Sequence, residues 1–139
     1  MPNPRQSQRR KQDLAQRIEQ LNSLVERLNA EIDKINRDGE IAPSGCWIVR
    51  YLSVGKGGRY WYYKWMAAEP IFVTKKGNPS RSQYLGKAGS EAYLKAVEML
   101  SRRVQIEAKE RAIGVLSQGL GDLVEEATRC QKDSREVSD

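Results

Sequence analysis

A heptad repeat near the start of this chain constrains its fold more than any other sequence feature. The apolar residues of the repeat are spaced alternately four and three positions apart, and they are Leu14, Ile18, Leu21, Val25, Leu28, Ile32 and Ile35. This spacing places one apolar seam along a helix, where it faces a partner helix. β-Branched residues occupy one of the two alternating seam positions and mostly leucine occupies the other, which is typical of parallel two-stranded coiled coils. We therefore predict a coiled-coil helix over residues 13–38, ended by Gly39.

Two different partners could cover this seam. One is a second copy of the chain, in which case the seven seam residues form a homodimer interface. The other is the chain's own C-terminal helix. Three unbroken heptads favour self-association, and both arrangements can coexist in a dimeric helical bundle. Asn22, Asn29 and Asn36 flank the seam where charges would usually select the partner, so the choice stays open.

The segment from Ser44 to Gly86 has the period-two alternation of β-strands. Two such runs, "CWIVRYLSV" and "RYWYYKWMAA", flank the glycine-rich turn "GKGG", and "IFVT" and "RSQYLG" follow. A turn of this composition between alternating runs indicates a β-hairpin. We predict an antiparallel sheet of three or four short strands.

One face of such a small sheet must be covered for the sheet to be stable. We expect the covered face to hold the uncharged set Trp47, Val49, Tyr51, Trp61, Tyr63, Trp65 and Tyr84. The opposite face would then present Arg50, Lys64, Arg81 and Gln83 beside Tyr60 and Tyr62. A register slip of one residue would invert this assignment.

A long helix should follow the sheet and pack on it. Ser90 is a good N-cap, and Glu91 lies at the positive end of the helix dipole. The predicted apolar stripe is Tyr93, Val97, Leu100, Val104, Ala108, Ala112, Val115 or Leu116, Leu120, Leu123 and Ala127. The glycines of "QGLG" predict a kink or break. The fold class is thus α+β, with a sheet-plus-helix module over residues 44–105, a helical extension over 106–130 and a frayed tail over 131–139.

Positive charge is concentrated in two segments of a chain whose net charge is +6. Residues 1–12 form a basic arm with four basic residues and no acid, and residues 44–87 hold eight basic residues against the single acid Glu69. A local field of this sign favours a polyanion such as nucleic acid. The candidate nucleic-acid-binding residues are Arg50, Lys56, Arg59, Tyr60, Tyr62, Lys64, Lys75, Lys76, Arg81, Gln83 and Lys87 of the sheet and Arg5, Arg9, Arg10 and Lys11 of the arm.

The composition argues against catalysis. The chain has no histidine, which removes histidine-based acid–base chemistry and histidine metal ligation. Cys46 and Cys130 have no metal-binding spacing and are expected to be packing residues. "GKGG" lacks the spacing of a phosphate-binding loop. We expect no enzymatic activity, no cofactor and no small-molecule substrate.

The location is expected to be intracellular. No run of eighteen apolar residues is present, and the basic N-terminus lacks the apolar segment of a secretory signal. We therefore expect a cytoplasmic protein without a membrane partner, associated with the nucleoid if it binds DNA.

The order of "WIVRY", "YWYYKW" and "QYLGKAGSEA" resembles the DNA-binding modules that consist of a three-stranded sheet and a helix. These are the arm-binding domain of phage-type tyrosine integrases and the plant ethylene-response-factor domain. The resemblance covers about 60 residues and implies that the sheet enters the major groove, with Arg50, Lys64, Arg81 and Gln83 as reading positions. The "AAEPIFVTKKGNPS" insertion and the heptad helix depart from that pattern.

Two functions from different classes follow from the sequence. The first is a dimeric DNA-binding regulator or accessory factor of a mobile element, with RNA as an alternative ligand because tyrosines on a basic sheet stack unpaired bases. The second is a coiled-coil interaction or scaffold protein whose basic sheet is only a solvated surface.

Overall fold

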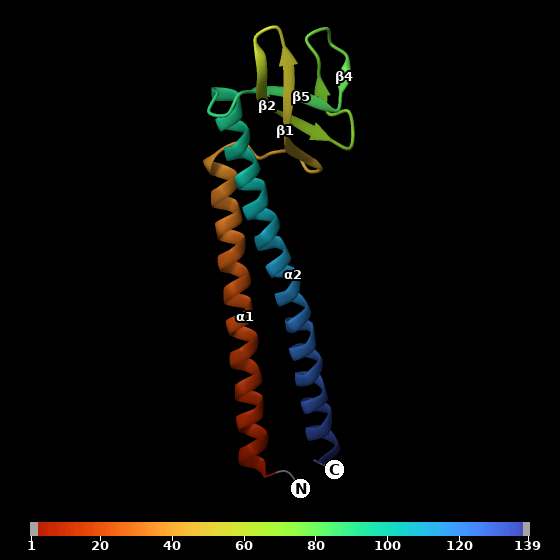
Figure 1. Ribbon diagram of the computed structural model, residues 1–139. Helices are drawn as coiled ribbons and strands as arrows, with labels where there is room; N and C mark the ends of the chain where they lie inside the picture. The colour runs from red at the N-terminus through yellow and green to blue at the C-terminus, as the bar shows by residue number, and fades with distance from the viewer. Residues whose placement is uncertain (1–2, 138–139) are drawn as a thin grey trace. The chain divides into compact units, whose positions relative to one another are not determined.

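The computed structural model of the protein describes residues 3–137, with side chains for residues 3–132. The described residues form two helices and five strands, which follow one another along the chain as α1 (Pro4–Asp38), β1 (Cys46–Gly55), β2 (Gly58–Ala67), β3 (Phe72–Val73), β4 (Pro79–Ser80), β5 (Ser82–Gly86) and α2 (Glu91–Val137) (Figure 1). The chain divides into a helical unit, residues 1–34 and 107–139, and a sheet unit, residues 35–106. The predicted α+β class is confirmed.

In the helical unit, α1 and the second part of α2 run antiparallel. The Lys109 ammonium contacts the Glu31 carboxylate at 2.7 Å, and Arg10 reaches Glu126 at 3.6 Å, so higher numbers on one helix meet lower numbers on the other. Leu14 is buried and the seam residues that follow it within this unit are half-buried. The heptad seam therefore faces the chain's own second helix, which is the intrachain alternative. Self-association of two chains stays a prediction.

The apolar stripe predicted for α2 is correct only in part. Leu116, Leu120, Leu123 and Ala127 are half-buried as expected, and Ile113 joins them. Four of the other predicted stripe residues are exposed, namely Val97, Val104, Ala108 and Ala112, and of the two alternatives at the next position Val115 is 68% exposed. From Leu100 to Ala112, successive residues of the predicted stripe are four positions apart. Each spacing of four rotates the stripe by about 40° around a helix with 3.6 residues per turn. The predicted stripe therefore drifts around the helix and misses several covered positions of this stretch, among them Ala96, Met99, Ile106 and Ile113.

Helix α2 continues through "QGLG", so of the predicted kink or break the break is wrong. A β-carbon built on Gly119 would lie 3.7 Å from Leu21 Cδ1, so the two helices approach closely at this glycine. Packing of Leu116, Leu120 and Leu123 along the same stretch offsets the low helix propensity of glycine.

The predicted boundaries of both helices also change. Helix α1 ends at Asp38, directly before Gly39, as predicted, but it begins at Pro4. The predicted basic arm is therefore helical where the structure describes it, and Arg5, Arg9, Arg10 and Lys11 belong to the first turns of α1. Helix α2 includes residues 131–137 of the predicted frayed tail, and residues 138–139 lie outside the described residues.

In the sheet unit, β1, β2 and β5 form an antiparallel sheet in the order β1–β2–β5, and β3 pairs with β4 in a separate short ladder. The predicted hairpin is confirmed: Lys56 and Gly57 form its two-residue turn, and Gly58 takes a φ of +118° that favours glycine. Strand β4 was not expected from the sequence.

The core of the sheet unit lies between the sheet and the first turns of α2. It consists of Ala42, Cys46, Trp65, Ala67, Leu85 and Ala96. Cys46 is therefore a packing residue, as predicted.

Ser90 joins the sheet to α2. Its hydroxyl accepts a hydrogen bond from the Tyr93 backbone N–H at 3.2 Å and donates one to the Leu85 carbonyl at 2.8 Å. Gly86 makes this close approach possible, because its φ is +96° and a β-carbon there would lie 3.2 Å from Ser90 Oγ. The predicted N-cap is thus confirmed, and it also fixes the start of α2 on the end of β5.

Candidate nucleic-acid interface

The length of the first turn decides which side chains share a face of the sheet. With two residues in the turn, Gly55 pairs with Gly58, so each odd-numbered residue of β1 opposes an even-numbered residue of β2. Directly opposed residues of an antiparallel pair lie on the same face. Trp47 therefore shares a face with Met66, Tyr51 with Tyr62, and Arg50 with Tyr63.

The predicted division of the aromatic residues between the two faces is consequently wrong. Each strand alternates as expected, but the two strands were combined in the wrong register. Tyr63 and Trp65 lie on the covered face, where Tyr63 packs on Tyr93 of α2 with ring centroids 4.7 Å apart. Trp47 and Tyr84, predicted to be buried, are 46% and 63% exposed on the opposite face.

The predicted cationic patch is wrong for the same reason. Arg50 opposes Tyr63 on the covered face, and its guanidinium lies 3.7 Å from the ring centre of Trp61. Lys64 opposes Val49 on the other face. Gln83 pairs with Trp65 at the edge of the covered face, and Arg81 precedes β5. Arg50, Lys64, Arg81 and Gln83 therefore do not form one surface.

We call the surface opposite the core the open face. Its ten residues are Trp47, Val49, Tyr51 and Ser53 of β1, Tyr60, Tyr62, Lys64 and Met66 of β2, and Ser82 and Tyr84 of β5. Half of these side chains are aromatic, and strands β1, β2 and β5 contain no acidic residue. The open face therefore combines rings with positive charge and carries no carboxylate of its own strands.

Three tyrosines form a row across the open face, one from each strand. The ring centroids of Tyr51 and Tyr62 are 6.0 Å apart, and those of Tyr62 and Tyr84 are 5.9 Å apart. The planes are tilted by 33° and 44°, so the rings are not stacked face to face on one another. We call these three residues the tyrosine row. Beside it, the Tyr60 hydroxyl donates a 2.6 Å hydrogen bond to the Gly57 carbonyl, which holds that ring against the turn.

Two lysines place their ammonium groups over these rings. Lys64 Nζ lies 4.8 Å from the ring centre of Tyr51. Lys87 Nζ lies 4.4 Å from the ring centre of Tyr60 and 5.9 Å from that of Tyr62. Such distances correspond to cation–π attraction. Of the predicted residues, the structure therefore brings together Tyr60, Tyr62, Lys64 and Lys87.

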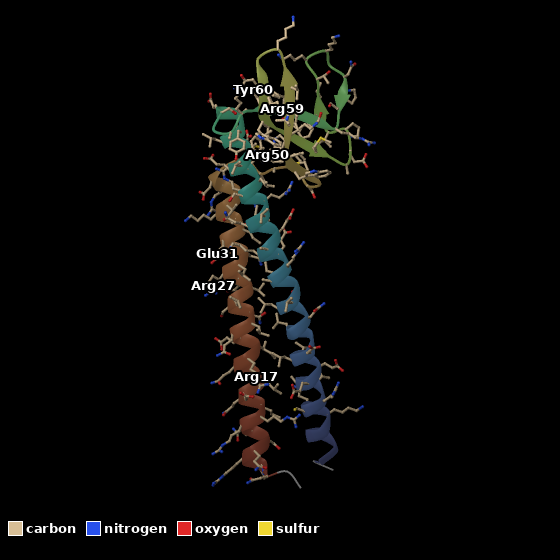
Figure 2. All side chains as sticks on the ribbon, in the orientation of Figure 1. Arg17, Arg27, Glu31, Arg50, Arg59 and Tyr60 are labelled. Carbon is tan, nitrogen blue, oxygen red and sulfur yellow. The ribbon has the colours of Figure 1, made fainter. Side chains whose placement is uncertain are left out.

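The remaining predicted cations lie elsewhere. Lys56 and Arg59 are at the tip of the first hairpin, where Figure 2 labels Arg59 beside Tyr60, and Arg59 opposes Val54 on the face of Arg50. Lys75 and Lys76 are in the turn between β3 and β4. The four cations of the predicted arm belong to the helical unit.

Sequence reasoning missed Trp47, Tyr51 and Tyr84 as residues of this surface. The signal that could have identified them is the turn itself. Two-residue hairpin turns are the commonest, and "GKGG" places Lys56 and Gly57 in such a turn. That assignment alone sets Tyr51 opposite Tyr62.

Neither described helix is long and apolar enough to cross a membrane. Over the same described residues, no group of three or more histidine, cysteine, aspartate or glutamate side chains could hold a metal ion. Comparison of the chain with protein-family models, with curated proteins and with solved structures finds no match. The resemblance to sheet-plus-helix DNA-binding modules therefore stays a prediction.

Proposed function

We propose that this protein binds nucleic acid through the open face of its sheet. The observation that carries the proposal is the tyrosine row, with the ammonium groups of Lys64 and Lys87 over neighbouring rings. Tyrosine rings stack on bases and sugars, and lysine ammonium groups bind phosphates. A surface without carboxylates imposes no repulsion on a polyanion.

The charge of the surrounding segment supports the same conclusion. Residues 44–87 carry eight basic residues and one acidic residue, a net charge of +7. The turn cations Lys56, Lys75 and Lys76 are exposed, so they are available for further phosphate contacts. This field would steer a nucleic acid toward the sheet unit and would weaken as salt is added.

The helical unit supplies a second element of the proposal. If two chains associate through it, two open faces belong to one assembly, as in the dimeric DNA-binding regulator or accessory factor predicted from the sequence. Such a protein would act in the cytoplasm, at the nucleoid if its ligand is DNA.

An interaction protein is the second candidate function. The observation that favours it is the incomplete burial of the heptad seam, because only Leu14 of the seam is buried while Ile18 and the later seam residues keep part of their surface. A further helix could cover that surface.

Fluorescence anisotropy with labelled nucleic acid tests the main proposal. The test variant is Lys64→Glu/Lys87→Glu, which reverses the two charges that lie over rings of the open face. The matched control is Lys34→Glu/Lys132→Glu, which makes the same charge change at two exposed lysines of the helical unit. Binding should be lost in the first variant and retained in the second.

Two results would contradict the proposal. The first is no binding by the unmodified protein at low salt to duplex DNA, single-stranded DNA or RNA. The second is an equal loss of binding in both double variants, because that would show a response to net charge without a defined surface. In either case the interaction protein would become the better description of the chain.

A further inference from the structure

We infer that the open face takes a single-stranded nucleic acid whose bases stack on the tyrosine row, in preference to a duplex. This inference rests on the proposed function and specifies the form of its ligand. It differs from the major-groove binding expected from the sequence, because the register has moved the arginines away from this surface.

The spacing of the rings is the first argument. Neighbouring ring centroids of the tyrosine row are 6.0 Å and 5.9 Å apart. Successive nucleotides of one strand in a duplex are spaced by roughly 3.4 Å, with the bases stacked on one another. A strand whose successive bases lie on successive rings must therefore be unstacked and extended, which a single strand can adopt and a base-paired strand cannot.

The second argument is the chemistry of the ten open-face residues. Specific contacts to base edges in the major groove come mainly from arginine, asparagine and glutamine, whose side chains bond two atoms of one base. The open face contains none of these residue types. Arg50 and Gln83 are on the covered face, and Arg50 already lies over Trp61. The open face can therefore offer rings, hydroxyl groups and ammonium groups, which suit stacking without sequence readout.

The exposure of the rings is the third argument. Tyr84 is 63% exposed, and Tyr51 and Tyr62 are half-buried, so each ring of the tyrosine row keeps surface that a base can cover. Lys64 lies over the ring of Tyr51 and Lys87 over those of Tyr60 and Tyr62, and long lysine side chains can rotate away in solvent. A base that stacks on Tyr51 or Tyr62 would displace the ammonium group from that ring, and the same ammonium group could then bind the adjacent phosphate.

The test compares three ligands of about 15 nucleotides, which is within the range of single-strand site sizes. The ligands are labelled oligodeoxythymidine, labelled oligouridine and the duplex of labelled oligodeoxythymidine with oligodeoxyadenosine. At about 0.1 M salt, where long-range attraction is screened, at least one single strand should bind more tightly than the duplex by about tenfold or more. The two single strands distinguish DNA from RNA as the source of the bases.

Substitutions at Tyr84 identify the ring as the binding element. Tyr84→Ala should weaken single-strand binding by between about fivefold and about 150-fold, the range expected when one base loses its stacking ring. Tyr84→Phe keeps the ring and should stay within about twofold of the unmodified protein. Because Tyr84 is mostly exposed, both variants should fold, and circular dichroism verifies this.

The outcomes separate the inference from the proposed function. If the duplex binds as tightly as both single strands and Lys64→Glu/Lys87→Glu abolishes that binding, the single-strand inference fails and the proposed function stands. If single strands bind but Tyr84→Ala and Tyr62→Ala leave the affinity unchanged, the inference fails as well. If no nucleic acid binds at low salt, both fail.

Discussion

Substitution of Gly119 by alanine should stabilise the helical unit. Glycine inside a helix costs about 1 kcal/mol relative to alanine, because its backbone loses more conformational freedom on folding. The new methyl group would lie 3.7 Å from Leu21 Cδ1, which is an ordinary van der Waals distance, so no strain opposes the gain. We expect the free energy of unfolding to rise by about 1 kcal/mol, with a few tenths more from the contact with Leu21.

Gly121→Ala is the matched control for this substitution. Gly121 lies in the same helix, and a β-carbon there would meet no atom within 4 Å. It should therefore report helix propensity alone, a gain of about 1 kcal/mol. The difference between the two variants measures the contact between α1 and α2.

Urea unfolding followed by far-ultraviolet circular dichroism is the appropriate assay, because it reports helix content. Fluorescence of the tryptophans gives an independent signal, since Trp47, Trp61 and Trp65 all lie in the sheet unit. If both alanine variants are destabilised, α2 is interrupted at these glycines. If Gly119→Ala stabilises the protein no more than Gly121→Ala does, the helices make no contact at Leu21. If only Gly121→Ala stabilises it, the helices are too close at Leu21 to admit a methyl group.

Further measurements address the cap, the ion pair, the ligand and self-association. In urea unfolding, Ser90→Ala should lower the free energy of unfolding by about 1–2 kcal/mol, because it removes the N-cap and leaves the Leu85 carbonyl without its hydroxyl donor. Ser90→Thr keeps the hydroxyl group and should keep most of the stability. The hydrogen bond from Lys109 lowers the pKa of Glu31 below its ordinary value of 4.5. The pair therefore stabilises the fold above that pH, and this contribution is lost as the pH falls through the lowered pKa. Glu31→Gln should flatten this part of an acid titration followed by circular dichroism, and an unchanged titration would contradict the pairing. If about four cations contact phosphates of a single strand, log affinity should fall against log salt with a slope of roughly −3, and a slope shallower than about −1 would contradict an electrostatic contribution of that size. Light scattering should give a mass of twice 15.8 kDa if two chains associate, and a monomer mass at every concentration would show that the intrachain helix pair needs no second copy.

The sequence was sufficient to predict most elements of the fold. Period-two alternation located β1 and β2, the serine–glutamate pair located the start of α2, and glycine marked the end of α1. These predictions succeed because each depends on local backbone chemistry. The continuity of α2 could not be predicted in this way, since packing against Leu21 outweighs the preference of Gly119.

The candidate site was less predictable than the fold because it depends on how strands combine. Alternation within one strand is a local property, and it was assigned correctly. The pairing of Tyr51 with Tyr62 depends on the number of residues in the turn, and a change of one residue there exchanges the two faces. The charge density of the segment identified the cations, but only the strand register shows that Lys64 and Arg50 lie on opposite faces of the sheet.

The alternation along β2 also limits how this unit can change during evolution. Tyr62 and Lys64 belong to the open face, while Tyr63 and Trp65 belong to the covered face. Inserting or deleting one residue inside the strand would carry the tyrosine rings inward and expose the tryptophan. Related chains should therefore keep the lengths of β2 and of the Lys56–Gly57 turn, differ in length between β2 and β5, and vary within the strands by substitution alone.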